Sequence, residues 1–174
     1  MEQERVTNFG LEPGVDSMTK IRRIKKEEWI LYKKIRLESL RDSPAAFSTT
    51  FEEALKRTEE SWKKQGEDAS LGRERCTFLI FHNEEVRGLA SIYEKEEKTI
   101  GELLQVWVSP ELRGTGTATD LVLAILGWAK DNDYQTIIAT VFNNNETALK
   151  FYLKHGFKMT KKNEKESILE TCLI

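Results

Sequence analysis

Residues that cross-link chains or bind metals are scarce in this sequence, which has two cysteines and two histidines among 174 residues. Cys76 and Cys172 lack the spacing of a metal site or of a disulfide framework, so a cysteine-rich secreted domain is excluded. We expect both to be reduced residues of the core and the protein to be cytoplasmic. His82 and His155 are far apart, and neither has a cysteine or carboxylate cluster beside it, so we expect no metal.

The sequence also lacks long apolar runs and an excess of charge of either sign. A helix needs about 20 apolar residues to cross a bilayer. Because neither such a run nor a secretory signal pattern is present, we expect no membrane partner. The 27 basic and 29 acidic side chains give a formal net charge of −2, which argues against nucleic acid as a partner.

The length and the hydrophobic pattern predict one mixed α/β domain over residues 19–174, after an N-terminal tail over residues 1–18. Apolar residues at helical spacing predict helices over residues 27–40, 51–65, 117–130 and 146–155, with a polar connection over 66–72. Apolar or alternating runs predict strands over residues 19–24, 76–81, 86–93, 100–108, 136–141, from 157 onward, and 167–174. The charges of the first strand place it near a sheet edge. The helix between residues 108 and 136 makes a right-handed crossover between two parallel strands.

The chain is organised around the stretch Val106 to Ala118, which reads V-W-V-S-P-E-L-R-G-T-G-T-A. A strand ends at Ser109-Pro110, a turn with two glycines follows, and a periodic helix then begins. Such a junction directs backbone N–H groups and the positive end of a helix dipole at one point, which favours a phosphate-like anion. Arg113 can add a charge-assisted contact, and Gly114 and Gly116 let the anion approach the backbone closely.

Three phosphate-binding patterns compete for this turn. A P-loop needs a lysine after its last glycine, which is absent here, and a dinucleotide fingerprint needs a glycine where Thr119 stands. The pattern [RQ]-x-x-G-x-[GA] fits fully, as Arg113, Gly116 and Ala118. With this motif between a strand and a long helix, the chain resembles the GCN5-related N-acetyltransferase (GNAT) family. The competing interpretation is an ordinary strand-to-helix turn that uses glycine for its geometry.

A second motif supports the resemblance. The string N-E-T-A-L-K-F-Y-L-K-H-G-F, from Asn145 to Phe157, is similar to the family signature N-x-x-A-x-x-[FL]-Y-x-[KR]-x-G-F. The first half of the chain matches the family only in the order of its elements. The resemblance implies the GNAT fold, with a mostly antiparallel central sheet of six to seven strands, a parallel splayed pair and about four helices.

In that family the pantetheine arm of acetyl-CoA runs between the splayed strands like an added strand. The resemblance therefore implies a cofactor-binding set at Val106, Trp107, Val108, Arg113, Gly114, Thr115, Gly116, Thr117, Ala118, Asn145 and Tyr152. Backbone groups of Val106 and Val108 would bind the arm, and the amides of residues 114–118 would bind the diphosphate. Asn145 would touch the arm or orient the cleft. The amide N–H of Val108 or Trp107 could polarise the thioester carbonyl.

The chemistry also needs a neutral amine and a proton for the departing thiolate. Tyr152 matches the family's tyrosine that protonates the coenzyme A sulfur; the alternative is an aromatic residue that packs beneath the cleft. Glu102 lies on the strand where several family members carry a base, and it is the leading candidate for that role. Glu94, Glu96 and a relay water are its rivals.

The predicted function is therefore N-acetyl transfer from acetyl-CoA to a primary amine by direct attack, without an acyl-enzyme. We expect the acceptor pocket around residues 42–50, with Trp107 and Asn143 nearby. Its neutral side chains fit many small amines or a peptide N-terminus, and the lack of a polybasic surface favours a small molecule. A protein or peptide acceptor and a non-catalytic acyl-CoA-binding module are the alternatives. Pairing into a homodimer through residues 166–174 is also left open.

Overall fold

The computed structural model describes residues 19–174, so the tail predicted over residues 1–18 lies outside the described residues. Its strands and α-helices are, in chain order, β1 (Thr19–Arg23), α1 (Trp29–Asp42), α2 (Phe51–Leu55), α3 (Glu59–Ser70), β2 (Arg75–His82), β3 (Glu85–Glu94), β4 (Ile100–Val108), α4 (Thr117–Asp131), β5 (Thr136–Phe142), α5 (Glu146–Lys154), β6 (Lys158–Lys162) and β7 (Glu166–Cys172). Short 3₁₀ turns at Lys26–Glu28, Pro44–Ala46 and Pro110–Leu112 precede α1, α2 and α4.

The seven strands form one sheet in the order β1-β2-β3-β4-β5-β7-β6. All neighbours are antiparallel except β4 and β5, so the predicted mixed fold with one parallel pair is confirmed. Strand β1 lies at one edge, as its charges predict, and β6 at the other. Because β7 is paired on both sides, residues 166–172 offer no free strand edge to a second copy. At the β7 end of the sheet the edge strand is β6, which is exposed and whose lysines discourage pairing with another chain.

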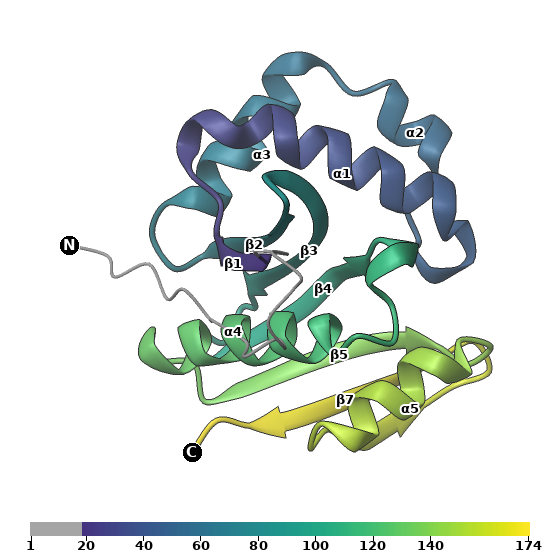
Figure 1. The fold of residues 1–174 in the computed structure, drawn as a ribbon. Helices are drawn as coiled ribbons and strands as arrows, with labels where there is room; N and C mark the ends of the chain where they lie inside the picture. The colour runs from purple at the N-terminus through teal and green to yellow at the C-terminus, as the bar shows by residue number, and fades with distance from the viewer. Residues whose placement is uncertain (1–18) are drawn as a thin grey trace, which may run out of the picture.

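Helices cover both faces of the sheet, with α1 and α3 on one face and α4 and α5 on the other (Figure 1). The side chains of adjacent residues in β2 point to opposite faces of the sheet. Ile80 packs in the cluster that contains Ile125 of α4, whereas Leu79 packs with Trp62 of α3. A strand buried on both faces reads as a continuous apolar run, which is why β2 shows little alternation. Each such buried side chain contributes about 1.5–3 kcal/mol to folding.

The prediction of a single helix over residues 51–65 is wrong, because α2 and α3 are separate helices. The side chain of Thr58 accepts a hydrogen bond from the Ser61 N–H at 3.1 Å and so caps a new helix in the middle of the predicted one. Helix α3 then runs through most of the predicted polar connection. The described chain therefore has five α-helices, where the sequence predicts about four.

Two further expectations fail for reasons of packing. Gly66 falls in the polar connection predicted over residues 66–72, yet it is buried in α3, where an added Cβ would lie 2.5 Å from the Cβ of Trp29. The absence of a side chain lets α3 approach the start of α1 closely. Cys76 is buried as expected, but Cys172 is exposed because β7 ends there at the rim of the sheet.

Candidate active site

The parallel strands β4 and β5 are paired only near their starts. Their register contains the pairs Ile100–Thr136, Gly101–Ile137 and Glu102–Ile138. Beyond Glu102, β4 stays paired with β3, and β5 stays paired with β7 along its whole length. The last six residues of β4, Leu103 to Val108, therefore have no strand partner on their β5 side, which confirms the splayed parallel pair.

A bulge in β4 accompanies this separation. Leu104 pairs with Ser91 and Trp107 with Leu89, so two residues of β4 face one residue of β3 between these pairs. Gln105 in the bulge has a φ of +59°, which non-glycine residues rarely adopt. Its side-chain oxygen accepts hydrogen bonds from Tyr32 at 3.0 Å and Ser91 at 3.1 Å, which hold it there. Because a bulge bends the strand that contains it, the bulge explains why β4 turns away from β5.

The end of β4 presents main-chain groups to the gap. The Ser109 N–H donates to the Arg87 carbonyl of β3 at 2.8 Å. Successive residues direct their main-chain groups to opposite sides of a strand, so those of Val108 face away from β3. The Val108 carbonyl accepts from Arg113 Nε at 3.0 Å, and its N–H faces the gap. Val106 lies in the same unpaired stretch, whereas the Trp107 ring packs in the cluster on the α1 and α3 face.

The turn after β4 has the backbone shape that the motif predicts. Gly114 and Gly116 have φ of +76° and +86°, a region that favours glycine. No atom lies within 4 Å of a Cβ built at either position, so the space beside the turn is open. Gly116 is the N-cap of α4 and has no side-chain capping bond. The N–H groups of Thr117, Ala118 and Thr119 have no intrahelical acceptor, and they point outward with the positive end of the helix dipole.

The hydroxyls of this turn stabilise its shape. The Thr115 hydroxyl donates to the Leu112 carbonyl at 2.5 Å. A hydroxyl has one proton, so at the 2.7 Å contact between Thr115 and Thr117 the Thr117 hydroxyl is the donor. Both predicted binding residues thus use their side chains within the turn, and their backbone amides are the groups available to an anion.

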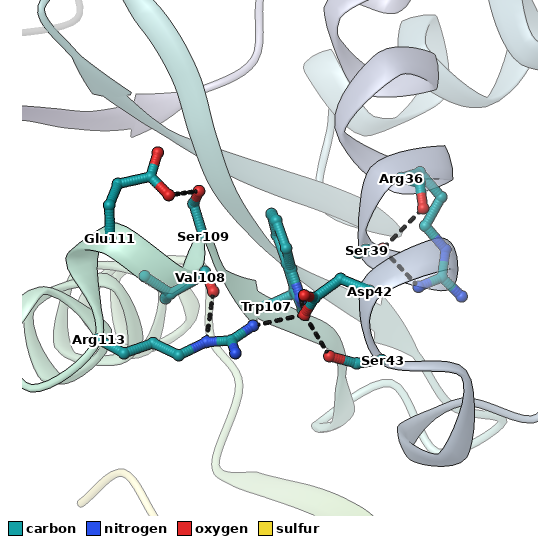
Figure 2. A network of polar contacts seen from close by, with 9 residues as sticks. All are labelled: Arg36, Ser39, Asp42, Ser43, Trp107, Val108, Ser109, Glu111 and Arg113. Carbon is teal, nitrogen blue, oxygen red and sulfur yellow. Dashed lines mark hydrogen bonds and ion pairs between the residues drawn. The ribbon is translucent and has the colours of Figure 1, made fainter.

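Asp42, at the end of α1, connects that helix to the turn (Figure 2). Its Oδ2 accepts from Arg113 Nη2 at 2.6 Å, from Trp107 Nε1 at 3.0 Å and from the Ser43 hydroxyl at 2.7 Å. The hydrogen bonds from Ser43, Arg113 and Trp107 lower the pKa of Asp42 to about 2. Arg113 uses two of its N–H groups for Asp42 and Val108, and the rest can still reach an anion beside the turn. Sequence reasoning missed Asp42, because no local pattern relates it to Arg113.

A hydrogen bond between Thr119 and His155 joins the start of α4 to the end of α5. His155 Nδ1 lies 2.7 Å from the Phe151 carbonyl, so this nitrogen is assigned the proton. In the neutral ring Nε2 is then an acceptor, and the Thr119 hydroxyl donates to it at 2.9 Å. This contact holds the second motif against the first, and neither residue was predicted to have this role.

The two asparagines after β5 have structural partners. Asn145 caps α5, since its Oδ1 accepts from the Ala148 N–H at 3.2 Å. Within residues 19–174 its amide NH₂ makes no hydrogen bond, so it stays available to the cleft. Asn143 donates to the Asn163 carbonyl at 2.8 Å and accepts from the Ser167 hydroxyl at 2.7 Å. Asn143 therefore fixes the junction of β5 and β7.

Tyr152 is 7% exposed and belongs to the same buried cluster as Val108 and Val141, near the ends of the two parted strands. The rings of Phe151 and Phe157 lie 5.5 and 5.1 Å from its ring. Burial raises the pKa of the Tyr152 phenol above its ordinary value, so it keeps its proton at neutral pH. Within residues 19–174 its hydroxyl makes no hydrogen bond, which leaves the proton available.

Glu102 lies where the strands separate, since it belongs to the last pair between β4 and β5. Its carboxylate contacts Lys95 Nζ at 3.2 Å and Thr140 Oγ1 at 3.5 Å, and its side chain is 26% exposed. The rival Glu94 forms an ion pair with Arg73.

In residues 19–174 there is no group of three or more histidine, cysteine or acidic side chains that could hold a metal ion. None of the helices in that part of the chain has the length and apolarity to cross a membrane.

A parallel strand pair that separates beside a glycine turn and an uncapped helix N-terminus is the arrangement that the two sequence motifs predict for a GNAT fold. The family model described as "Acetyltransferase (GNAT) family" matches residues 36–157. The chain therefore belongs to the GNAT family of acetyltransferases.

One related sequence and two solved structures agree with this assignment. A mycothiol acetyltransferase from Thermobispora bispora is 29% identical over 146 residues, which are 84% of this chain and 44% of the relative. The chain thus spans less than half the length of that curated relative. A GNAT acetyltransferase from Streptococcus pneumoniae has the same fold, with a TM-score of 0.78, 17% identity, and coverage of 88% of this chain and 98% of that one. The PaiA N-acetyltransferase from Thermoplasma acidophilum, solved with coenzyme A, has a TM-score of 0.72 at 18% identity, with the same coverage.

Proposed function

We propose that this acetyltransferase moves an acetyl group from acetyl-CoA to the nitrogen of a primary amine on a small molecule, by direct attack. The observation that carries the proposal is the parting of β4 and β5 beyond Glu102, directly beside the turn that begins α4. A gap with unpaired strand edges accepts an extended amide-bearing arm, and a helix N-terminus accepts a diphosphate. The structural neighbour named as an N-acetyltransferase in complex with coenzyme A supports this choice of donor.

The turn fits the diphosphate of coenzyme A. Its two glycines have positive φ and open space beside them, and the first N–H groups of α4 lack helical acceptors. In the proposed complex the diphosphate lies on the amides of residues 114–118, and Arg113 turns part of its guanidinium toward it. The pantetheine arm lies along Val106 to Val108, and Asn145 borders the arm from the β5 side.

The proposed reaction uses three groups of this chain. Glu102, directly or through a water, takes a proton from the ammonium group, and the freed lone pair attacks the thioester carbonyl. The N–H of Val108 donates to the developing oxyanion. As the carbon–sulfur bond breaks, the Tyr152 hydroxyl donates its proton to the thiolate, and its high pKa keeps that proton in place until then. The attacking nitrogen loses its remaining extra proton to the Tyr152 oxygen through solvent, so the products are a neutral amide, a thiol and the restored phenol. Both Glu94 and Glu102 form an ion pair, with Arg73 and Lys95 respectively, and Glu102 is preferred because it lies where β4 and β5 separate.

The proposal is tested by incubating the protein with acetyl-CoA and a mixture of amines, and by following acetylated products by mass spectrometry and thiol release together. We expect an amide product from at least one small primary amine, in amounts equal to the thiol released. Acetylation of peptides alone would support the peptide acceptor instead. Thermal stabilisation by acetyl-CoA with no turnover of any amine would indicate a non-catalytic acyl-CoA-binding module. In that case the proposed reaction is wrong and the proposed coenzyme site stands.

A further inference from the structure

A cavity of about 280 Å³ lies between α1, α2, α3 and the strands β2 to β4. It reaches β4 at Leu104 and at the bulge residue Gln105, immediately before the unpaired edge that faces the gap. Only Thr49 comes from the loop over residues 42–50 where the sequence predicts the acceptor pocket, and neither Trp107 nor Asn143 lines it. The cavity is therefore beside the proposed reaction centre but is built from other residues than the predicted ones.

The charge of this cavity is one-sided. Its lining contains Arg36, Arg57 and Arg75, and no aspartate or glutamate is among the described residues that line it. Arg36 is only 6% exposed. Its one hydrogen bond to a side chain is a long contact of 3.4 Å with Ser39, and no carboxylate within residues 19–174 pairs with it. An ionised group buried without a counter-charge is costly, so this arrangement favours an anion from outside the chain.

Each of the three arginines stacks on an aromatic ring. The guanidinium of Arg36 lies 4.6 Å from the ring of Phe47, and those of Arg57 and Arg75 lie 3.9 and 4.7 Å from the rings of Trp62 and Tyr93. Arg57 also donates from Nε and Nη2 to Ser61 at 3.0–3.3 Å, so its Nη1 group is the one without a hydrogen bond in the described chain. Stacking occupies the flat face of a guanidinium and leaves the remaining N–H edges available. Those edges match the oxygens of a carboxylate or phosphate in a bidentate geometry.

The uncharged lining groups also offer donors. Gln65 donates to the hydroxyls of Tyr32 and Tyr93 at 2.7 Å each, and Tyr32 donates onward to Gln105. The Tyr93 proton has no acceptor in the described chain. The indole N–H of Trp62, which is completely shielded from solvent, has no hydrogen-bond partner within residues 19–174. A site in which donors outnumber acceptors fits a ligand that supplies acceptor oxygens.

We propose that the amine acceptor carries an oxyanion, a carboxylate or a phosphate, which the cluster of Arg36, Arg57 and Arg75 binds. The inference rests on the proposed function, because it assigns the class of substrate for the same reaction. The oxyanion lies among the three arginines, and the amine extends from there past Gln105 toward Val108. Amines of matched length without the anionic group are then poor acceptors, since they leave the buried Arg36 unpaired.

The first experiment compares ω-amino acids, from glycine to 6-aminohexanoate, with n-alkylamines of equal length and with the corresponding aminoalkylphosphonates. We expect kcat/KM for the best anionic amine to exceed that of its neutral counterpart by about a hundredfold. A preference for the amino acids or for the phosphonates tells which oxyanion is bound. Equal or better turnover of the neutral amines would overturn the inference while leaving the proposed function intact.

The second experiment replaces the arginines one at a time, as Arg36→Gln, Arg57→Gln and Arg75→Gln. Arg41→Gln is the matched control, because Arg41 stacks on Phe51 at 4.6 Å in the same helix as Arg36 but does not line the cavity. Each cavity variant should lower kcat/KM for the anionic amine by about tenfold or more, with little change for the neutral amine. Equal losses on both amines would contradict the inference. Since Arg75 is exposed, its variant is expected to fold even if Arg36→Gln does not.

A binding measurement separates this inference from the proposed function. The N–H resonance of the Trp62 indole is followed by NMR while 4-aminobutyrate, 3-aminopropylphosphonate or n-butylamine is added with coenzyme A present. Suppose that the protein acetylates no amine, but that the Trp62 resonance moves with either anionic probe and not with n-butylamine. That result would uphold the oxyanion site and refute the proposed reaction. No movement with either anionic probe at millimolar concentration would refute the oxyanion site.

Discussion

Three glycines with open space around them allow the role of the turn to be separated from its backbone strain. Gly116 has a φ of +86° at the start of α4, Gly72 has a φ of +65° before β2, and Gly127 lies within α4 without a positive φ. A Cβ at any of the three would meet no atom within 4 Å. Alanine at each position therefore changes backbone conformational energy without causing a clash in the free protein.

The magnitudes follow from the backbone angles. Alanine in the left-handed region costs about 1–2 kcal/mol, so Gly116→Ala and Gly72→Ala should both lower the free energy of unfolding by that amount. For a chain of this size the melting temperature then falls by about 2–8 °C. Gly127→Ala should raise the free energy of unfolding by about 0.5–1 kcal/mol, because alanine is the better helix former. Thermal unfolding of the three variants measures these shifts.

Coenzyme affinity distinguishes the positions. The added Cβ of Gly116→Ala occupies the space proposed for the diphosphate, so the Kd for coenzyme A should rise about tenfold or more. Gly72→Ala has the same strain away from the turn and should bind coenzyme A like the unmodified protein. Calorimetric titration measures both. Normal coenzyme affinity in Gly116→Ala, or an equal loss in Gly72→Ala, would refute the assignment of the diphosphate to the turn.

Three further substitutions test the other residues of the site. Tyr152→Phe should lower kcat by about a hundredfold or more with acetyl-CoA affinity nearly unchanged, and unaltered turnover would remove the hydroxyl from the mechanism. Glu102→Gln should flatten the acidic limb of the pH profile of kcat/KM, and an unaltered limb would assign the base elsewhere. The pKa of Asp42 is lowered to about 2 in the folded protein, so its contribution to stability is present above about pH 4 and is lost as the pH falls through 2. Asp42→Asn should remove that acid-dependent contribution, worth less than about 1 kcal/mol for a partly exposed pair, and urea unfolding at pH 6 and at pH 2.5 measures it. An unchanged difference between the two pH values would show that the ion pair of Asp42 with Arg113 contributes nothing.

The strands and the turn were predictable because their signals are local. The parallel direction of β4 and β5 follows from one strand, one glycine turn and one helix in sequence, and the glycine turn itself follows from a six-residue motif. The cap of α5 at Asn145 is equally local. For these features neighbouring residues determine the geometry, and tertiary packing does not override it.

The break between α2 and α3 was missed although its signal is local too. Thr50 and Thr58 each cap the start of a helix, because the hydroxyl of each accepts a hydrogen bond from the N–H of the residue three positions later. The apolar spacing continues across the break and therefore favours one continuous helix. Burial of Gly66 against Trp29 could not be read in the same way, since it depends on how two helices cross.

The cavity was not predictable because its residues come from separate parts of the chain. Arg36, Arg57 and Arg75 lie in or beside α1, α2 and β2, at spacings that match no motif. The neutral loop over residues 42–50 suggested an uncharged pocket, yet it contributes a single lining residue. The contact of Asp42 with Arg113 was missed for the same reason, because 71 residues separate the two in sequence.

The central claim is that the amides between Arg113 and Ala118 bind the diphosphate of coenzyme A. The most direct measurement is the backbone amide NMR spectrum during titration with coenzyme A and, separately, with pantetheine, which lacks the diphosphate. We predict that the amide signals of Gly114, Gly116 and Ala118 move with coenzyme A and stay in place with pantetheine. Signals that stay in place at saturating coenzyme A would contradict the claim.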